Sequence, residues 1–515
     1  MTTKALLRRL IVTTSVPPIA SLYRWIYRAF VEIAVRRLRR FPDLRAIYLR
    51  RGLAAGDGIP GISDIDLAVV GDWGAAAQTR VMDSYTRLAR RYPVFDPTLG
   101  VYTPESLVRL FDTDPFLRHR LAEGQRRWKR LFGEDCLKRL GSLDENQAVV
   151  GYEAELRVWW RYFAYTAFSG RADLSDRIFV NSLCYKVVAE SIGMESGLRG
   201  LPVPESREEA IAQALSNATG DDAAFLERLA QNGRQRHLRY CGEIFEDTQS
   251  FLIPFLEKCY ADLAARPAWQ GAADVTVRVD FPECEQLHSR EAILDRLRDA
   301  AGPQWARISV AGSTVFAMDE LVLFFEPAAG QTPSTADLRV LARACAEKLG
   351  HLRSRVTFYL RLPSVALQFH SSDEYRGWQA ILSPLCHPDA FPDCIPARWT
   401  ESCAAFIRQE RLLLADALDD PAIYKANDLD FLRMVWKFLD LVIAETSAAS
   451  GEAVFAQTPE AVLRGLRYIG APEAPFLENF AAAYRRELSG SPAGIGRDVP
   501  RAVEYLRMVH DGFGK

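Results

Sequence analysis

The sequence predicts an α+β protein in which a small mixed β-sheet with its helices is followed by an α-helical bundle, and in which this arrangement occurs twice. A strand, a glycine-rich loop and a second strand follow one another over residues 46–70. Helical spacing of apolar residues dominates residues 145–265. The segment 432–439 aligns without a gap with 156–163, which indicates internal duplication; chance convergence of helix-rich sequence is the alternative. The predicted domains are 1–140, 141–270, 271–400 and 401–515.

The central stretch places two carboxylates at the start of the second strand. Residues 46–50 and 65–70 read as strands, and Asp64 and Asp66 open the second one. The loop between them contains Gly52, Gly56, Gly58 and Gly61. Because side chains alternate along a strand, the two acids point to one side and Ile65 to the other. Close carboxylates repel unless a cation lies between them, and Mg²⁺ or Mn²⁺ suits oxygen ligands. A polar hairpin loop with solvated acids is the alternative.

The complete string carries more information than the acids alone. A strand, the glycine-rich loop, Pro-Gly-Ile-Ser-Asp-Ile-Asp at 60–66 and an apolar strand follow in order. This resembles the signature of the polymerase-β-like nucleotidyltransferase superfamily, over the N-terminal quarter of the chain. The resemblance implies a nucleotidyltransferase-like sheet in which Asp64 and Asp66 bind the metal and act in catalysis. It also implies transfer of a nucleoside monophosphate from an NTP to a hydroxyl group. The acceptor stays open between a small molecule, a protein and an RNA end.

The chain departs from this family at the phosphate-binding turn. The family has Gly-Ser after the first strand, and this chain has Arg51-Gly52. A guanidinium grips phosphate oxygens through paired hydrogen bonds, so Arg51 is either a substitute grip or a solvated side chain. Arg51, Gly52 and Ser63 are the predicted phosphate side of the site. Lys186, on a predicted helix at 181–190, is the predicted further nucleotide contact.

The third carboxylate that the resemblance implies is Asp96. A helix is predicted at 75–91 and a strand at 93–104, and the family's third acid lies on that strand beside the first two. Asp96 precedes Pro97, so the alternative is a turn residue.

Other segments near the motif have readings of their own. Residues 19–40 form a basic amphipathic helix, which could lie on a membrane or bind RNA; packing of its apolar side on its own sheet is the favoured reading. A basic helix is predicted at 123–133, ending at Gly133, and a polar connector at 202–222. The short apolar run near the N-terminus is broken by two prolines and makes a poor signal peptide.

The second half follows the same predicted order with altered residues. A strand with Gly-Ser spans 308–313, an acidic strand 319–325, a helix 335–352 and a strand 356–362. Met318 stands where the first acid is expected, and the adjacent Asp319 and Glu320 point to opposite faces of a strand. The alternative function is therefore an inactive protein of this fold that binds a nucleotide or acts as a protein-interaction scaffold.

Composition limits the class of protein. The 515 residues carry a net charge of −2, with 49% hydrophobic and 25% charged residues, an ordinary globular balance without a global charge for nucleic acid. Nine scattered cysteines without a Cys-x-x-Cys pair favour reduced thiols in the cytoplasm over disulfides or a zinc site. No apolar run is long enough to span a membrane. The oligomeric state stays open.

Overall fold

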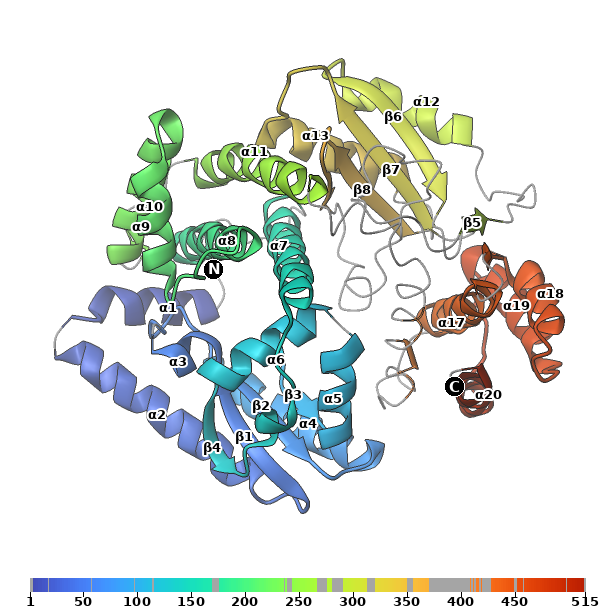
Figure 1. Ribbon diagram of the computed structural model, residues 1–515, viewed down its shortest axis with the longest axis horizontal. Helices are drawn as coiled ribbons and strands as arrows, with labels where there is room; N and C mark the ends of the chain where they lie inside the picture. Colours follow the sequence, from blue (N-terminus) through green and yellow to red (C-terminus); the bar gives the residue numbers. More distant parts are fainter. Residues whose placement is uncertain are drawn as a thin grey trace. The chain divides into compact units, whose positions relative to one another are not determined.

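The structure of the chain is a computed structural model with mixed α+β architecture, which confirms the predicted class (Figure 1). Contacts divide it into two compact units, residues 1–159 with 172–251 and residues 160–171 with 252–515. The four domain ranges stay a prediction. The described residues are 3–16, 18–56, 58–96, 98–113, 115–168, 176–235, 237–238, 243–265, 276–279, 290–312, 320–349, 355–369, 408, 411, 414–415, 418, 428–448, 452–456, 458–496 and 498–513.

A four-stranded mixed sheet, in the order β3-β2-β1-β4, forms the core of the first unit. The strands are β1 (Leu44–Arg50), β2 (Asp66–Gly71), β3 (Gly100–Tyr102) and β4 (Lys129–Gly133). β1 is antiparallel to β2 and to β4, and β2 is parallel to β3. The two strands expected around the glycine-rich loop are therefore confirmed, and they are adjacent, with Arg50 opposite Asp66 in the register.

Alternation along β1 and β2 produces two apolar faces. Ile47, Leu67 and Val69 pack with α2 (Ile19–Leu38) and α4 (Ala75–Arg91). The opposite face packs on α5 (Pro104–Thr113), α6 (Pro115–Arg127) and the short helix η1 (Cys136–Arg139); its strand residues are Ala46, Tyr48, Ala68 and Val70. Since Ile65 belongs to the first cluster, Asp66 points to the other face, as the alternation predicts.

The glycine-rich segment is not entirely a loop. Its first residues form the short helix α3 (Arg51–Ala55), and the left-handed Gly56 at φ +90° ends it. Gly56 and Gly58 both donate backbone hydrogen bonds to the Gly52 carbonyl, at 2.9 and 3.0 Å. The segment is therefore a folded turn that sets the direction of α3 relative to β2.

Two sequence predictions near the sheet are wrong in detail. Residues 93–104 do not form one strand: Phe95 makes a single parallel bridge with Ile65, and β3 is short. The predicted helix at 123–133 ends at Arg127, and residues 129–133 form the edge strand β4. Gly133 ends this strand at φ +77°, and a Cβ there would lie 1.7 Å from the Arg45 carbonyl oxygen, so its glycine reflects close strand packing rather than a helix stop.

The remaining helices of this region confirm the helical expectation for the described part of 145–265. They are α7 (Glu145–Phe168), α8 (Arg177–Leu198), α9 (Arg207–Asn217), α10 (Gly220–Arg234) and α11 (Ile244–Ala264). The predicted polar connector at 202–222 is wrong, because α9 lies inside it, with Ser206 accepting the first-turn Glu209 amide. One further helix, α1 (Thr3–Thr14), was not predicted. Among the described helices, none is long and apolar enough to cross a membrane.

The second unit contains another four-stranded sheet, in the order β6-β7-β8-β9. The first pair is antiparallel, β7 and β8 are parallel, and β8 and β9 are antiparallel. Its elements are α12 (Arg290–Ala301), β6 (Trp305–Gly312), β7 (Glu320–Pro327), α13 (Thr335–Leu349), β8 (Arg355–Arg361) and β9 (Ala366–Phe369). Ser313, Met318 and Asp319 lie outside the described residues.

The C-terminal helices pack together in one hydrophobic cluster, which contains the fully buried Trp436 of α17. They are α17 (Asp428–Ala448), α18 (Pro459–Tyr468), α19 (Phe476–Leu488) and α20 (Val499–Phe513). The strand β10 (Glu452–Phe455), between α17 and α18, pairs in parallel with β5 (Thr276–Val279). This two-stranded sheet connects the C-terminal helical region to the start of the second half of the chain.

Candidate functional site

Two carboxylates converge at the start of β2. The Ile65 amide donates to the Val94 carbonyl at 2.8 Å, and the Asp96 amide donates to the Ile65 carbonyl at 3.1 Å. This short parallel pairing places Asp96 beside Asp66, and Arg51 Nη1 lies within 4 Å of a carboxyl oxygen of each acid, at 3.3 and 3.9 Å. Asp66 is buried, with 6% of its surface exposed. The third-carboxylate prediction for Asp96 thus has the expected neighbour, although Asp96 also forms the turn that was the alternative.

The turn is visible in the hydrogen bonds of Asp96. Its Oδ1 accepts the Thr98 amide at 2.7 Å and also the Thr98 hydroxyl. Burial alone would raise the pKa of Asp96, but these bonds and the Arg51 charge outweigh it and lower that pKa. Burial, aided by the charge of Asp96, raises the pKa of Asp66 to about 6. The negative charge of Asp96 thus favours the protonated form of Asp66.

Arg51 is the cation on this acidic pair. Its Nη1 lies 3.3 Å from Asp66 Oδ1 and 3.9 Å from Asp96 Oδ2. The Arg51 backbone is left-handed, at φ +57°, a conformation that favours glycine. A strained residue of this kind costs on the order of 1 kcal/mol and persists only where its surroundings hold it. Arg51 therefore occupies a position with a glycine-like backbone, and its side chain supplies a positive charge to the two acids.

The other predicted residues of the loop lie differently. The Ser63 hydroxyl accepts the Ile59 amide at 3.0 Å, and the Ser63 amide donates to the Ile59 carbonyl at 2.8 Å. Ser63 therefore closes the turn that leads into β2. Asp64 is half-buried, and its charge acts on the hydroxyl groups of Tyr27 and Tyr85.

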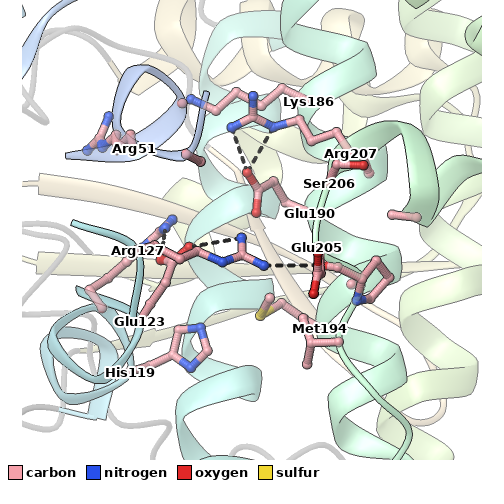
Figure 2. A pocket seen from close by; sticks show the side chains of 18 of the residues that line it. Arg51, His119, Glu123, Arg127, Lys186, Glu190, Met194, Glu205, Ser206 and Arg207 are labelled. Atoms are coloured by element: carbon pink, nitrogen blue, oxygen red, sulfur yellow. Dashed lines mark hydrogen bonds and ion pairs between the residues drawn. The ribbon is translucent and has the colours of Figure 1, made fainter. Parts of the chain in front are cut away.

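A basic cavity of about 100 Å³ lies beside Arg51, between α3, α6, α7, α8 and the start of α9 (Figure 2). Six basic side chains line it, and only three acidic ones. The basic residues are Arg51, Arg120, Arg126, Arg127, Lys186 and Arg207, and the acidic ones are Glu123, Glu190 and Glu205. The excess of basic over acidic side chains gives the cavity a positive potential, which attracts anions.

Lys186 and Glu190 face the cavity from successive turns of α8, and Figure 2 shows Lys186 extending toward the turn that carries Arg51. Burial, together with the charges of Arg207 and Arg51, lowers the pKa of Lys186 to about 8. Its Nζ lies 4.8 Å from the centre of the Trp159 ring, a cation–π contact. Lys186 therefore remains largely protonated at neutral pH, and the charges of Glu190 and Asp66 support its protonated form.

The arginines of the cavity are held in place by specific partners. Arg207 donates from Nε and Nη2 to Glu190 Oε1, at 3.0 and 2.9 Å. Burial would raise the pKa of Glu190, but Arg207, Arg120 and Lys186 lower it to about 2. Arg127 donates to the Pro204 carbonyl at 3.3 Å. These contacts orient the guanidinium groups before any ligand arrives, which reduces the entropy lost on binding.

Three predicted residues, Arg51, Gly52 and Lys186, thus line one cavity, and Arg51 joins it to Asp66 and Asp96. The sequence prediction missed Arg120, Arg127, Glu190 and Arg207. Glu190 could have been predicted from its spacing. It lies four residues after Lys186 on one predicted helix, which places both side chains on the same face. Arg207 could not be predicted in this way, because its helix lies within the segment that was predicted to be a connector.

Asp66 and Asp96 have the ligand chemistry of a divalent-ion site. Within the described residues, no group of three His, Cys, Asp or Glu side chains is placed to hold a metal. Asp66 and Asp96 do converge, and Mg²⁺ commonly uses one or two carboxylates together with substrate phosphates. This pair fits one ion in that mode, at the position that the Arg51 charge now neutralises.

Comparison with known proteins adds no assignment. No protein-family model matches the chain, and no curated protein matches it.

Proposed function

We propose that this protein binds a nucleoside triphosphate together with Mg²⁺ or Mn²⁺ and transfers the nucleoside monophosphate to a hydroxyl-bearing acceptor. One observation carries the proposal: Arg51 contacts the acidic pair Asp66 and Asp96 and also lines the basic cavity. An acid pair for a cation and a cationic cavity for phosphates are thus joined by one side chain. The resemblance of residues 46–70 to nucleotidyltransferases agrees with this arrangement.

The cavity residues account for binding of the phosphates. Arg207, Lys186 and Arg51 offer charge-assisted hydrogen bonds, which are the strong ones for phosphate oxygens. A cavity of about 100 Å³ accommodates phosphate groups and is smaller than a site for a whole nucleotide, so the nucleoside extends beyond it. Asp66 and Asp96 would hold the divalent ion, which when bound neutralises charge that develops on the transferred phosphoryl group. Asp64, half-buried two residues before β2, was predicted with Asp66 as a metal ligand, and we retain it as a further ligand of the ion.

The experiment is a binding and incorporation screen with the full chain. Labelled ATP, CTP, GTP and UTP are offered with Mg²⁺ or Mn²⁺ and a panel of small-molecule, protein and RNA acceptors, and binding is measured by calorimetry. We expect metal-dependent binding of at least one NTP and its incorporation into one acceptor class. Absence of both binding and incorporation would refute the proposal.

A second function has its own observation. The Arg51 guanidinium already neutralises Asp66 and Asp96, as a permanent counter-ion would in an inactive protein of this fold. Such a protein would bind a nucleotide or a protein partner without transfer. NTP binding without turnover in the screen would favour this function.

Arg51→Gly separates the two functions. Glycine adopts the left-handed backbone of position 51 without strain, so the variant removes the side chain while sparing the turn. If Arg51 moves to the phosphates during transfer, NTP affinity should fall by about 1.5–3 kcal/mol, the value of a hydrogen bond to a charged group, while Mg²⁺ binding without NTP should strengthen. If Arg51 is a permanent counter-ion, calorimetry should show unchanged NTP affinity and a loss of stability. Arg139→Gly, at an exposed arginine of η1, is the control for loss of charge.

We also infer that the second sheet is a degenerate copy of the first. Each sheet follows a helix (α2 or α12), pairs its first two strands antiparallel, and after a crossover helix (α4 or α13) adds a parallel third strand. Shared connectivity of this kind supports duplication and agrees with the alignment of 432–439 on 156–163. The residues that would decide whether the second copy retains a site, 313–319, fall outside the described part.

A further inference from the structure

The N-terminal helices present large apolar side chains to solvent. Among the residues that the structure describes, fifteen large hydrophobic side chains are exposed, and seven of them belong to α1, α2 or the turn between these helices. They are Leu6, Leu10, Val16, Ile19, Leu22, Trp25 and Ile33, and Trp25 is 65% exposed. We call the first six of these residues the N-terminal patch. Single exposed apolar residues are ordinary, whereas a concentration in one short segment marks an interaction site.

The opposite faces of both helices are packed, so the N-terminal patch is a second, separate surface. In α1, Ile11 and Val12 are buried, and Arg8 pairs with Asp176 and lies over the Phe179 ring at 5.0 Å. In α2, Tyr27 accepts the Gly61 amide at 2.8 Å and belongs to the apolar cluster of the sheet. The expectation that the apolar side of residues 19–40 packs on the sheet is therefore only partly correct. Leu22, Trp25 and Ile33 remain outside.

The charge of the same segment is strongly positive. Residues 1–42 contain nine lysines and arginines and a single acidic residue, Glu32, whereas the whole chain has a net charge of −2. The rest of the chain is accordingly acidic. Arg9, Arg24, Arg28 and Arg36 are exposed on the same two helices. Exposed apolar side chains and exposed arginines thus share the same two helices, on a protein whose remaining residues carry a net negative charge.

We propose that the N-terminal patch binds the surface of an anionic lipid membrane, with α1 and α2 lying in the interface. Amphipathic helices of this composition insert their apolar side chains at the headgroup boundary, and their arginines attract anionic lipids. An exposed Trp flanked by Leu and Ile favours a partner with an apolar interior over RNA, whose backbone offers charge without apolar depth. A second copy of this segment would meet the first with the same positive charge. The proposal is independent of the nucleotide site.

Flotation of the full chain with lipid vesicles tests this proposal. We expect binding to vesicles of phosphatidylcholine with 30% phosphatidylserine, weak binding to phosphatidylcholine alone, and loss of binding as salt is raised. The double variant Leu22→Ser and Trp25→Ser should weaken binding by about a hundredfold, from the loss of two buried apolar side chains. Arg24→Gln with Arg28→Gln should weaken it by about twentyfold.

The control variant is Tyr468→Ser, because Tyr468 is 87% exposed at the end of α18 and lies outside the patch. It should bind vesicles like the unmodified protein, and circular dichroism should be unchanged for all variants. The proposal is overturned if the full chain does not float with anionic vesicles, or if the patch variants float as well as the control. It is equally overturned if the full chain binds an RNA oligonucleotide or self-associates instead of binding vesicles, and the patch variants abolish that interaction.

Discussion

Asp66→Asn is expected to reduce metal-dependent nucleotide transfer by a thousandfold or more, which corresponds to roughly 4 kcal/mol of barrier. Asn keeps the volume of Asp66 and removes the charge that, with Asp96, would hold the divalent ion. The phosphate-binding residues of the cavity, such as Lys186 and Arg207, are untouched. NTP binding should therefore persist in the variant, and the loss should appear in the turnover number measured by label incorporation.

Asp72→Asn is the matched control, because Asp72 follows the same strand but is exposed and paired with Arg45. It should retain full activity. An Asp66→Asn protein with the same turnover as the control would remove Asp66 from the mechanism and leave the non-catalytic function as the better proposal.

Asp66→Asn should also stabilise the fold at neutral pH. The pKa of Asp66 is raised by burial to about 6, above its ordinary value. A carboxyl whose folded pKa is raised contributes stability that is fully present at pH below the unfolded value and is lost as pH rises through the folded one. The unmodified protein should thus lose stability between about pH 4 and 6 from this group, whereas Asp66→Asn should not. Urea unfolding at several pH values measures the difference, and equal pH profiles would contradict it.

Arg120→Met is expected to destabilise the first unit by about 3–5 kcal/mol, because it leaves a buried acid without its partner. Arg120 pairs through Nη2 with Glu155, whose side chain is 1% exposed, and through Nη1 with Glu123 Oε2 at 3.1 Å. Burial already raises the pKa of Glu155 to about 7 despite the Arg120 charge. Without that charge, Glu155 should be protonated in the folded protein at higher pH, so the defect should be smallest near pH 5 and grow toward pH 8.

The double variant Arg120→Met with Glu155→Gln supplies the critical comparison. Neutralising Glu155 removes the unpaired charge and should restore most of the stability lost in Arg120→Met, as measured by urea unfolding. The exposed pair Arg485 and Glu460, with 53% and 41% of the side chains exposed, is the surface control. Arg485→Met should cost less than about 1 kcal/mol. A loss of equal size at both sites would show that burial of Glu155 has no special cost.

Local sequence patterns determined the strands and the position of the acids. Residues 46–50 and 65–70 are apolar runs on either side of a glycine-rich turn. Short apolar runs of this kind favour paired strands whose side chains are buried on both faces of a sheet. Alternation along the second strand placed Ile65 in the core and Asp66 on the opposite face. The helix at 75–91 was likewise readable from its own spacing.

Tertiary structure alone decided which distant residues meet. Residues 129–133 have the composition of a basic helix, yet they become an edge strand because β1 offers unpaired backbone groups there. The contact of Arg51 with Asp66 and Asp96 depends on a left-handed backbone at Arg51 and on the short pairing of Ile65 with Phe95. The basic cavity gathers side chains from four helices and α3, among them Arg207, whose helix was not predicted.

The exposure of the N-terminal patch could also not be predicted from the sequence. Spacing along residues 19–40 shows that apolar side chains recur, but α2 has more of them than its sheet can cover. Periodicity reports the direction of a side chain relative to its own helix, whereas burial depends on what other segments place against it. Tyr27 packs in the apolar cluster of the sheet, whereas Trp25 is exposed to solvent. The sequence therefore determined the elements and their faces, and the packing of distant segments decided which faces became core, cavity or surface.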